Sequence, residues 1–328
     1  MKDATMKRLP ICAIALALVA VLAACGGGGG ASSPAPSGPT PTTASSTATA
    51  TASPTATATA SSTTSSSTSS TYTGRVVSTD SGNASVSGAR ILVGTAWTYQ
   101  GQGYAISNVL STATTAANGS FSINLPANAT FIEVDAAGLV SAHRPVQTTP
   151  NSWGVGPLAN SFGTIGLPTA TADDFAELPV VNYDRATLGT GNGALALSLD
   201  ADMELAARAT TKNEGTLGYY AHEQPGTNYG FGIHYTCTVL VGAFCANPIY
   251  QDESLGAGPT ETSVQMEQGN IALGPSDGHY QLVISATNLF VGFGEYLGGV
   301  PPGGSPTSVT TYNYQAQEYL TTSDNPSP

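Results

Sequence analysis

The sequence predicts two folded domains, an all-β sandwich followed by an α+β domain, behind a disordered N-terminal linker. Residues 26–70 contain almost only Gly, Ser, Thr, Ala and Pro, so this segment cannot bury a core. From Tyr72 onward, short runs of alternating hydrophobicity are separated by turn residues about every ten positions, which is typical of a sandwich. After Pro168, helix-like spacing comes first and strand-like runs follow, which favours an α+β fold.

The first residues have the layout of an export signal. Lys7 and Arg8 precede an apolar run, residues 11–22, which is shorter than the roughly 20 residues of a membrane-spanning helix. The run ends in Val21-Leu22-Ala23-Ala24-Cys25, which resembles the lipobox of bacterial lipoproteins. The resemblance implies that Cys25 is acylated and becomes the first residue of the mature chain. The alternative is an ordinary signal peptide in which Cys25 is incidental.

The expected address is therefore a bacterial membrane, with Cys25 as the lipid anchor. Several acyl chains hold a protein on a membrane almost permanently, because each buried methylene contributes about 0.8 kcal/mol. Gly26 is not the acidic residue that often marks retention at the inner membrane, so an outer-membrane or cell-surface location is favoured.

Two cysteines remain after the signal is removed and Cys25 is acylated. In an oxidising compartment, Cys237 and Cys245 are expected to form a local disulfide. A metal or redox pair is the alternative, but the spacing fits neither Cys-x-x-Cys chemistry nor a zinc finger.

Charge excludes one class of partner. The 328-residue chain has a formal net charge of -12, whereas nucleic-acid binding and electrostatic binding to anionic lipid both need clustered Lys and Arg. We therefore expect no nucleic-acid partner.

Four segments of the first domain predict strands: 73–77, 88–93, 120–125 and 131–136. Asn118-Gly119 is predicted to supply the positive φ angles of a tight hairpin before the third strand. The order of these motifs, from Thr73-Gly74-Arg75-Val76 to Val134-Asp135-Ala136-Ala137-Gly138, resembles the carboxypeptidase regulatory-like (prealbumin-like) module. That resemblance covers residues 71–167 and implies a structural or adhesive role.

The second domain is expected to begin with two helices. Asp173 and Asp174 are predicted to cap the first, with Pro179 in its first turn and Gly189 at its end. Asp200 is predicted to cap the second, which has one apolar face formed by Met203, Ala206, Ala207 and Thr210. Strands are expected at 280–284, 289–293 and 309–314.

Several motifs of this domain resemble the CAP superfamily (cysteine-rich secretory, antigen 5 and pathogenesis-related proteins, also called SCP domains). They are Val181-Asn182-Tyr183-Asp184-Arg185-Ala186, Leu197-Ser198-Leu199-Asp200, Tyr220-Ala221-His222, Gly278-His279-Tyr280, Val291-Gly292-Phe293-Gly294 and Tyr312-Asn313-Tyr314-Gln315. The resemblance spans residues 168–322, leaving 323–328 as a tail, and it implies an α-β-α sandwich.

The same resemblance implies a cleft with two histidines and one or two glutamates that can hold a divalent cation (Zn, Ca or Mg). Matched by motif, these residues are His222, His279 and Glu253, with Glu267 as second glutamate and Glu261 behind it. Glu253-Ser254 departs from the family's Glu-Asn pattern, which puts that position in doubt.

The residue types alone allow three interpretations of this group. Imidazole and carboxylate ligands suit Zn²⁺ or a similar ion, and a His-Glu pair can act as a general base on water. Alternatively, His222 and His279 are half-buried residues bonded to loop backbone. His143 and His234 are expected to be surface or structural residues, and Glu223 to be solvated.

No familiar catalytic motif was found: the sequence has no Gly-x-Ser-x-Gly elbow, phosphate-binding loop or His-Glu-x-x-His. No catalytic residue is therefore assigned. The leading hypothesis is a surface lipoprotein that binds a small ligand, lipid, or cell-wall or peptide fragment without catalysis. A metal-assisted hydrolase and a purely structural or adhesive protein are the alternatives.

Overall fold

The computed structural model describes residues 69–101, 103–146, 160–227, 229–240, 250–304 and 312–321. Backbone contacts place Thr64–Pro328 in one compact unit. Cys25, Cys245 and residues 26–68 of the predicted tether lie outside the described residues, so acylation and the disulfide stay predictions. Ser70, the last predicted tether residue, instead begins the first strand. Within the described residues, no helix is both long and apolar enough to cross a membrane.

The first half of the described chain is built from two four-stranded sheets. In one, β1 (Ser70–Ser78) pairs with β10 (Ser161–Leu167), β2 (Ala84–Ser85) and β7 (Ser120–Leu125). The other has the order β6 (Ser111–Thr114), β3 (Arg90–Gly94), β8 (Phe131–Asp135), β9 (Ala142–Pro145). A separate hairpin joins β4 (Ala96–Tyr99) and β5 (Tyr104–Ser107).

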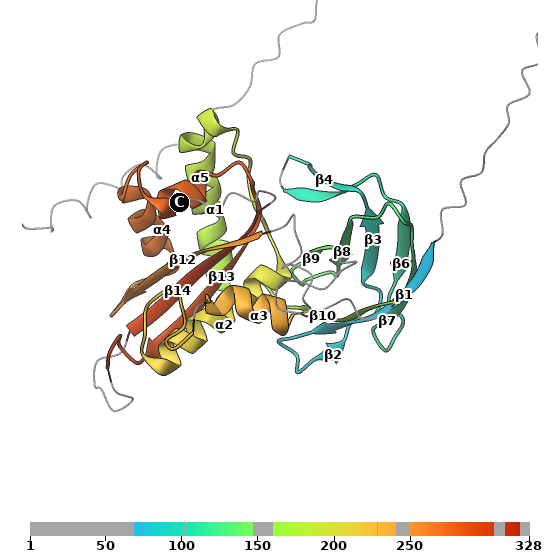
Figure 1. The fold of residues 1–328 in the computed structure, drawn as a ribbon, viewed down its shortest axis with the longest axis horizontal. Helices are drawn as coiled ribbons and strands as arrows, with labels where there is room; N and C mark the ends of the chain where they lie inside the picture. The colour runs from blue at the N-terminus through green and yellow to red at the C-terminus, as the bar shows by residue number, and fades with distance from the viewer. Residues whose placement is uncertain are drawn as a thin grey trace, which may run out of the picture. The chain divides into compact units, whose positions relative to one another are not determined.

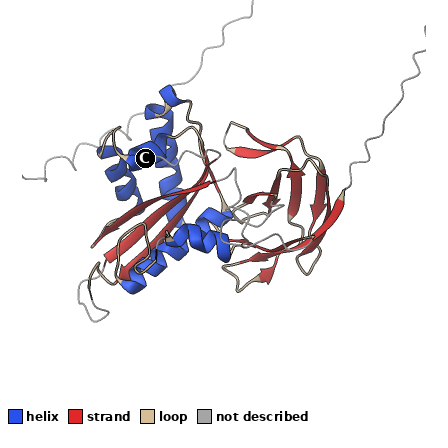
Figure 2. Ribbon diagram, viewed as in Figure 1, coloured by secondary structure: helices blue, strands red, loops and turns tan. Residues whose placement is uncertain are grey.

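Strand alternation explains how these two sheets form one core. Phe121, Ile123 and Leu125 of β7 are buried, while the residues between them are exposed, because side chains of a strand alternate between its faces. They pack in one cluster with residues such as Ile91 and Val134 from the other sheet. All four predicted strands of this half occur at the expected places. Figure 2 shows the strands of the structure in red.

The tight turn predicted at Asn118-Gly119 is present, with the Gly119 N–H donating to the Ala116 carbonyl at 2.9 Å and the Ala116 N–H donating to the Ser120 carbonyl at 2.8 Å, but it does not join two strands of one sheet. The strands on either side, β6 and β7, belong to different sheets. Only Gly119 has a positive φ, +77°, and a Cβ there would lie 2.4 Å from the Val76 carbonyl oxygen. Asn118 instead accepts a hydrogen bond from the Ser120 backbone N–H at 3.0 Å, an Asx turn that carries the chain between sheets.

The second half is a four-stranded sheet between two layers of helices (Figure 1). The strand order is β11 (Ser198–Leu199), β13 (Asn288–Gly299), β14 (Tyr312–Thr321), β12 (Tyr250–Gly258). One face packs on α2 (Ala201–Leu217), which carries α3 (Phe231–Thr238). The opposite layer contains α1 (Ala172–Leu188), α4 (Ser263–Ala272) and α5 (Gly278–Ile284). The described chain is thus a β-rich α+β protein.

Glycines in β13 let α2 approach the sheet closely. A Cβ on Gly292 would lie 2.0 Å from the Glu204 backbone nitrogen, and one on Gly294 would lie 2.2 Å from the Ala207 carbonyl carbon. The α2 face predicted from sequence is the buried face, with Met203 and Ala207 both 0% exposed. Asp200 caps this helix as predicted, accepting from two backbone N–H groups.

The start of α1 differs from the prediction. Its N-cap is Thr171, which forms a capping box with Asp174, so the two aspartates lie inside the first turn. Pro179 lies well inside the helix, not in its first turn. The carbonyl that loses its donor there belongs to Phe175, a residue on the exposed face of the helix, where water can replace the bond.

The strand predicted at 280–284 is wrong, because these residues form helix α5. Asp277 caps the helix by accepting from the His279 backbone N–H. A short apolar run such as Leu282-Val283-Ile284 has no periodicity that separates strand from buried helix. The prediction at 289–293 is confirmed within β13, whereas of 309–314 only Tyr312 onward lies in the described residues, in β14.

Strand β9 and the start of α2 hold the two halves of this unit together. Arg144 makes two hydrogen bonds to Asp202, at 2.7 and 2.6 Å, with both side chains buried. His143 contacts the Asp200 carboxylate at 3.0 Å and stacks on Phe290 with ring centroids 4.0 Å apart. These buried polar contacts fix β9 against the helix.

Candidate functional site

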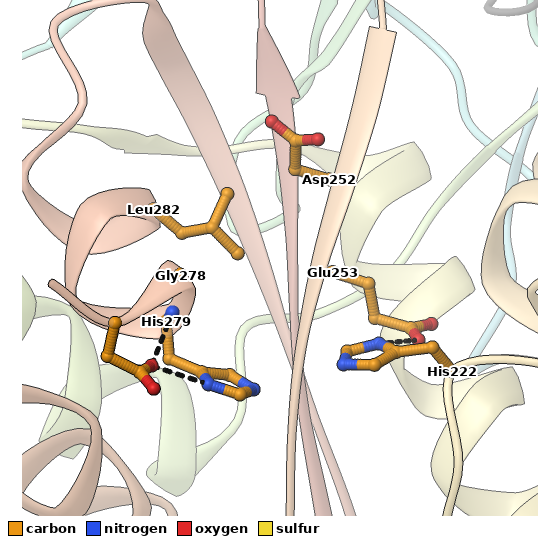
Figure 3. A pocket seen from close by; sticks show the side chains of 7 residues that line it. His222, Asp252, Glu253, Gly278, His279 and Leu282 are labelled. Atoms are coloured by element: carbon orange, nitrogen blue, oxygen red, sulfur yellow. Dashed lines mark hydrogen bonds and ion pairs between the residues drawn. The ribbon is translucent and has the colours of Figure 1, made fainter. Parts of the chain in front are cut away.

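His222 and His279 line the same cavity, although 57 residues separate them (Figure 3). Their ring centroids are 5.9 Å apart. The cavity has a volume of 320 Å³, at the small end of ligand pockets. Its lining residues are His222, Asp252, Glu253, Asp277, Gly278, His279 and Leu282. Six of these seven are polar or have no side chain, so the cavity suits a polar occupant.

The loop after α2 brings His222 to the sheet. Gly218 ends α2 in the left-handed conformation, φ +69°, and turns the chain back. The Tyr220 hydroxyl then donates to the Leu255 carbonyl of β12 at 2.9 Å. The bridge between Glu223 and Gly230 closes the loop, so His222 is held beside β12.

His279 is placed by the first turn of α5. The Asp277 carboxylate accepts from the His279 backbone N–H and lies 2.9 Å from its Nδ1. These hydrogen bonds hold the pKa of Asp277 below its usual value. The imidazole is therefore fixed by the residue that caps its own helix.

Both imidazoles are held through Nδ1 and present their second nitrogen to the cavity. His222 Nδ1 lies 3.0 Å from Glu253 Oε1, and His279 Nδ1 lies 2.9 Å from Asp277 Oδ1. In Figure 3 the remaining ring nitrogens point toward each other across the gap. A neutral imidazole that donates through Nδ1 is an acceptor at Nε2, so the tautomer of each ring decides whether it can accept a hydrogen bond from a ligand in the cavity.

Glu318, which the sequence interpretation missed, supports Glu253 from behind. The two glutamates lie directly opposite each other on β12 and β14. Glu318 also accepts from Thr210 Oγ1 at 3.1 Å and Gln251 Nε2 at 2.7 Å. Only the strand register brings the two carboxyl groups together, and no sequence motif marks it.

Burial controls the charge of this carboxyl pair. It raises the pKa of Glu253 to about 8, and the hydrogen bond from Glu318 partly opposes that shift. The pKa of Glu318 lies well above its usual value, because the group is fully buried and faces the Glu253 charge. Burial also lowers the pKa of His222. A hydrogen bond between two carboxyl groups requires a proton, so the buried pair Glu253 and Glu318 shares one.

Asp252 also lines the cavity and was not predicted. Its carboxylate receives no hydrogen bond or ion pair from any described residue, and Figure 3 shows it on the cavity wall above Leu282. Burial raises its pKa. A half-buried carboxylate without a partner is uncommon in a folded protein.

The structure does not bring Glu267 into the cavity. This residue lies in α4, is fully buried and accepts from Gln317 Nε2 at 2.9 Å. Burial raises its pKa to about 7. The sequence placed it by proximity alone, whereas α4 turns this side chain toward β14. Glu261, the reserve candidate, also lies outside the cavity lining.

The other two histidines lie away from this cavity. His143 is buried between Asp200 and Phe290, which is a structural role. His234 is partly buried and stacks on Tyr229 with centroids 4.2 Å apart. Glu223 is exposed, as expected for a solvated side chain, and borders a smaller cavity of 180 Å³ behind His222.

The described residues do not form a complete ligand set for the cation that the CAP resemblance implies. In the part of the chain that the structure describes, no group of three or more His, Cys, Asp or Glu side chains is placed to hold a metal ion. Glu253 is engaged by His222 and Glu318, and Asp252, although it lines the same cavity, does not complete a group of three ligands with the two imidazoles. The site is therefore interpreted without a metal.

Comparison with known proteins gave few matches. No protein-family model and no curated protein matches the chain. Among solved structures, an extracellular protein containing an SCP domain from Bacillus anthracis is 12% identical, with 64% of this chain and 57% of that chain aligned and a TM-score of 0.30. A 9R-lipoxygenase from Cyanothece is 16% identical over 38% of this chain and 23% of its own, with a TM-score of 0.18. At these TM-scores neither likeness identifies a fold or a function.

Proposed function

We propose that this protein is an exported, Cys25-anchored lipoprotein that binds a small polar ligand, without catalysis, in the cavity between His222 and His279. The observation that supports this most is the shared cavity: two imidazoles from distant segments present their free nitrogens to one hollow. The lipobox-like sequence supports the anchor and the address. The β-sandwich serves as a rigid support for the binding half.

The cavity favours a polar fragment over a lipid. Among its described lining residues, Leu282 alone is large and apolar, and the volume of 320 Å³ suits a compound of a few polar groups. A sugar or peptide unit of a cell-wall fragment has that character. An acyl chain would leave Asp252 and the two imidazoles buried without hydrogen-bond partners, which costs free energy.

Binding without catalysis is proposed because the described lining of the cavity offers no hydroxyl, thiol or amine nucleophile. Its described lining contains no Ser, Thr, Cys or Lys. The His222–Glu253 pair has the arrangement of a base and its orienting group, so water activation is the second candidate function. No step of either candidate depends on a metal.

Side-chain NMR of the four histidines tests the proposal. Titration with N-acetylglucosamine, a short peptide and a fatty acid should shift the His222 and His279 signals saturably for a polar compound, while His143 and His234 stay unchanged. The variants His222→Ala and His279→Ala should each weaken binding at least about tenfold, the loss of roughly one good hydrogen bond. Unchanged binding in both variants would overturn the proposal. Turnover that both variants abolish would establish the hydrolase instead.

A further inference from the structure

The geometry points to a ligand that carries an ammonium group. Asp252 is the counter-ion of this group, and the two imidazole Nε2 atoms accept hydrogen bonds from it. This inference rests on the proposed function, since it names the chemical class of ligand for the same cavity. It follows from the charges and the hydrogen-bond donors and acceptors of the residues that line the cavity.

The described lining of the cavity contains carboxyl groups and no basic Lys or Arg side chain. Three of its seven lining residues, Asp252, Glu253 and Asp277, carry carboxyl groups, and none is Lys or Arg. Two of these carboxyl groups are occupied, each by the Nδ1 atom of a histidine. Asp252 alone is available, because no described residue bonds to its carboxylate.

The histidines add acceptors, not donors. Asp277 Oδ1 accepts from the His279 backbone N–H and lies 2.9 Å from His279 Nδ1, so the geometry places the ring proton on Nδ1. The Nε2 atom of His279 then faces the cavity as an acceptor. His222 Nδ1 lies 3.0 Å from Glu253 Oε1, and its Nε2 atom faces the cavity in the same way.

An occupant that satisfies these groups must be rich in N–H donors and positively charged. An ammonium group has three donors and a compact charge, so it matches one carboxylate and two imidazole nitrogens. An anion would face Asp252 across a small cavity, and a neutral hydroxyl compound would leave the Asp252 charge uncompensated. A free amine of an amino acid, peptide or amino sugar has the required chemistry.

Two matched probes test the inference on purified full-length protein: Nα-acetyl-lysine methylamide and its Nε-acetylated form, which differ in one positive charge. We expect the first to shift the His222 and His279 NMR signals saturably, with an affinity at least about tenfold above that of the second. Asp252→Asn should remove most of this difference. Glu261→Gln removes a carboxylate that lies outside the cavity lining, and should change the affinity less than about twofold.

Equal affinity for the two probes, or an Asp252→Asn affinity equal to that of the original protein, would overturn the inference. The probe comparison needs no variant, so it holds even if Asp252→Asn fails to fold. Saturable binding of N-acetylglucosamine but of neither lysine derivative would reject the ammonium ligand and leave the proposed function standing. Shifts caused by Zn²⁺ but not by the ammonium probe would replace the inference with a metal site. No shift with any probe would reject both proposals.

Discussion

Removing Arg144 should reveal how strongly the β-sandwich half and the helical half depend on each other. Arg144 of β9 makes a bidentate pair with Asp202 of α2, and the side chains are 4% and 0% exposed. Methionine retains much of the side-chain length of arginine, but in Arg144→Met the buried carboxyl group of Asp202 is left without a partner. Breaking a buried pair in this way costs about 3–5 kcal/mol of unfolding free energy.

The loss should depend on pH in a direction that the structure fixes. Burial raises the pKa of Asp202 to about 6 even with Arg144 present, and without the guanidinium it must rise further. A folded-state pKa above the unfolded value means that stability falls as pH rises through this range. The variant should therefore lose more stability at pH 8 than at pH 5, where the carboxyl group can take up a proton.

Urea unfolding followed by circular dichroism measures this loss. Arg90→Met is the matched control, because Arg90 pairs with Asp135 at the surface with its side chain 59% exposed, and it should lose about 1 kcal/mol or less. Adding Asp202→Leu to Arg144→Met should recover most of the stability, since an apolar pair replaces the orphaned charge. An Arg144→Met loss no greater than that of Arg90→Met would refute the reasoning.

Three further predictions concern the binding half. Gly292→Ala should destabilise the protein by about 3 kcal/mol in urea unfolding, because the new Cβ would meet the backbone of α2. A loss of stability below that of an exposed Gly191→Ala control would contradict this packing. Glu318→Gln keeps a hydrogen-bond donor toward Glu253 and should retain the Nδ1–H tautomer of His222 in ¹⁵N NMR. Glu318→Leu removes that donor and should lose this tautomer. Equal spectra for the two variants would show that Glu318 does not position Glu253. Burial raises the pKa of Glu214 and Glu253 to about 8, so the folded state binds more protons than the unfolded state between their ordinary pKa and that value. The melting temperature should therefore be higher at pH 5 than at pH 8, each carboxyl group contributing up to about 1.4 kcal/mol per pH unit, and a rise toward pH 8 would contradict the burial of these groups.

Local sequence signals predicted the elements that depend on local physics. The Asp200 cap, the apolar face of α2 and the alternating strand β7 all follow from residue spacing within one element. The α5 segment did not, because three consecutive apolar residues pack equally well as a strand or as a short buried helix. Pro179 likewise lies beyond its expected turn, because the helix is capped by Thr171, two residues before the first of the predicted caps.

The candidate site was only partly accessible to sequence reasoning. His222, Glu253 and His279 were proposed from a family resemblance, and the structure places them around one cavity. Asp252 and Glu318 were missed because their roles come from strand register and from the lack of a partner, which are tertiary properties. Glu267 was chosen by proximity along the chain, and helix α4 directs it elsewhere.

The proximity of the two imidazoles is the claim on which the binding site depends, and a nuclear Overhauser measurement tests it directly. With the four histidines assigned by single substitutions, the ring protons of His222 and His279 should give a cross-peak, since their centroids lie 5.9 Å apart with the free nitrogens facing. The His143 ring should give none with either. A spectrum in which the His222 and His279 rings show contacts only to separate surroundings would contradict the shared cavity and every proposal built on it.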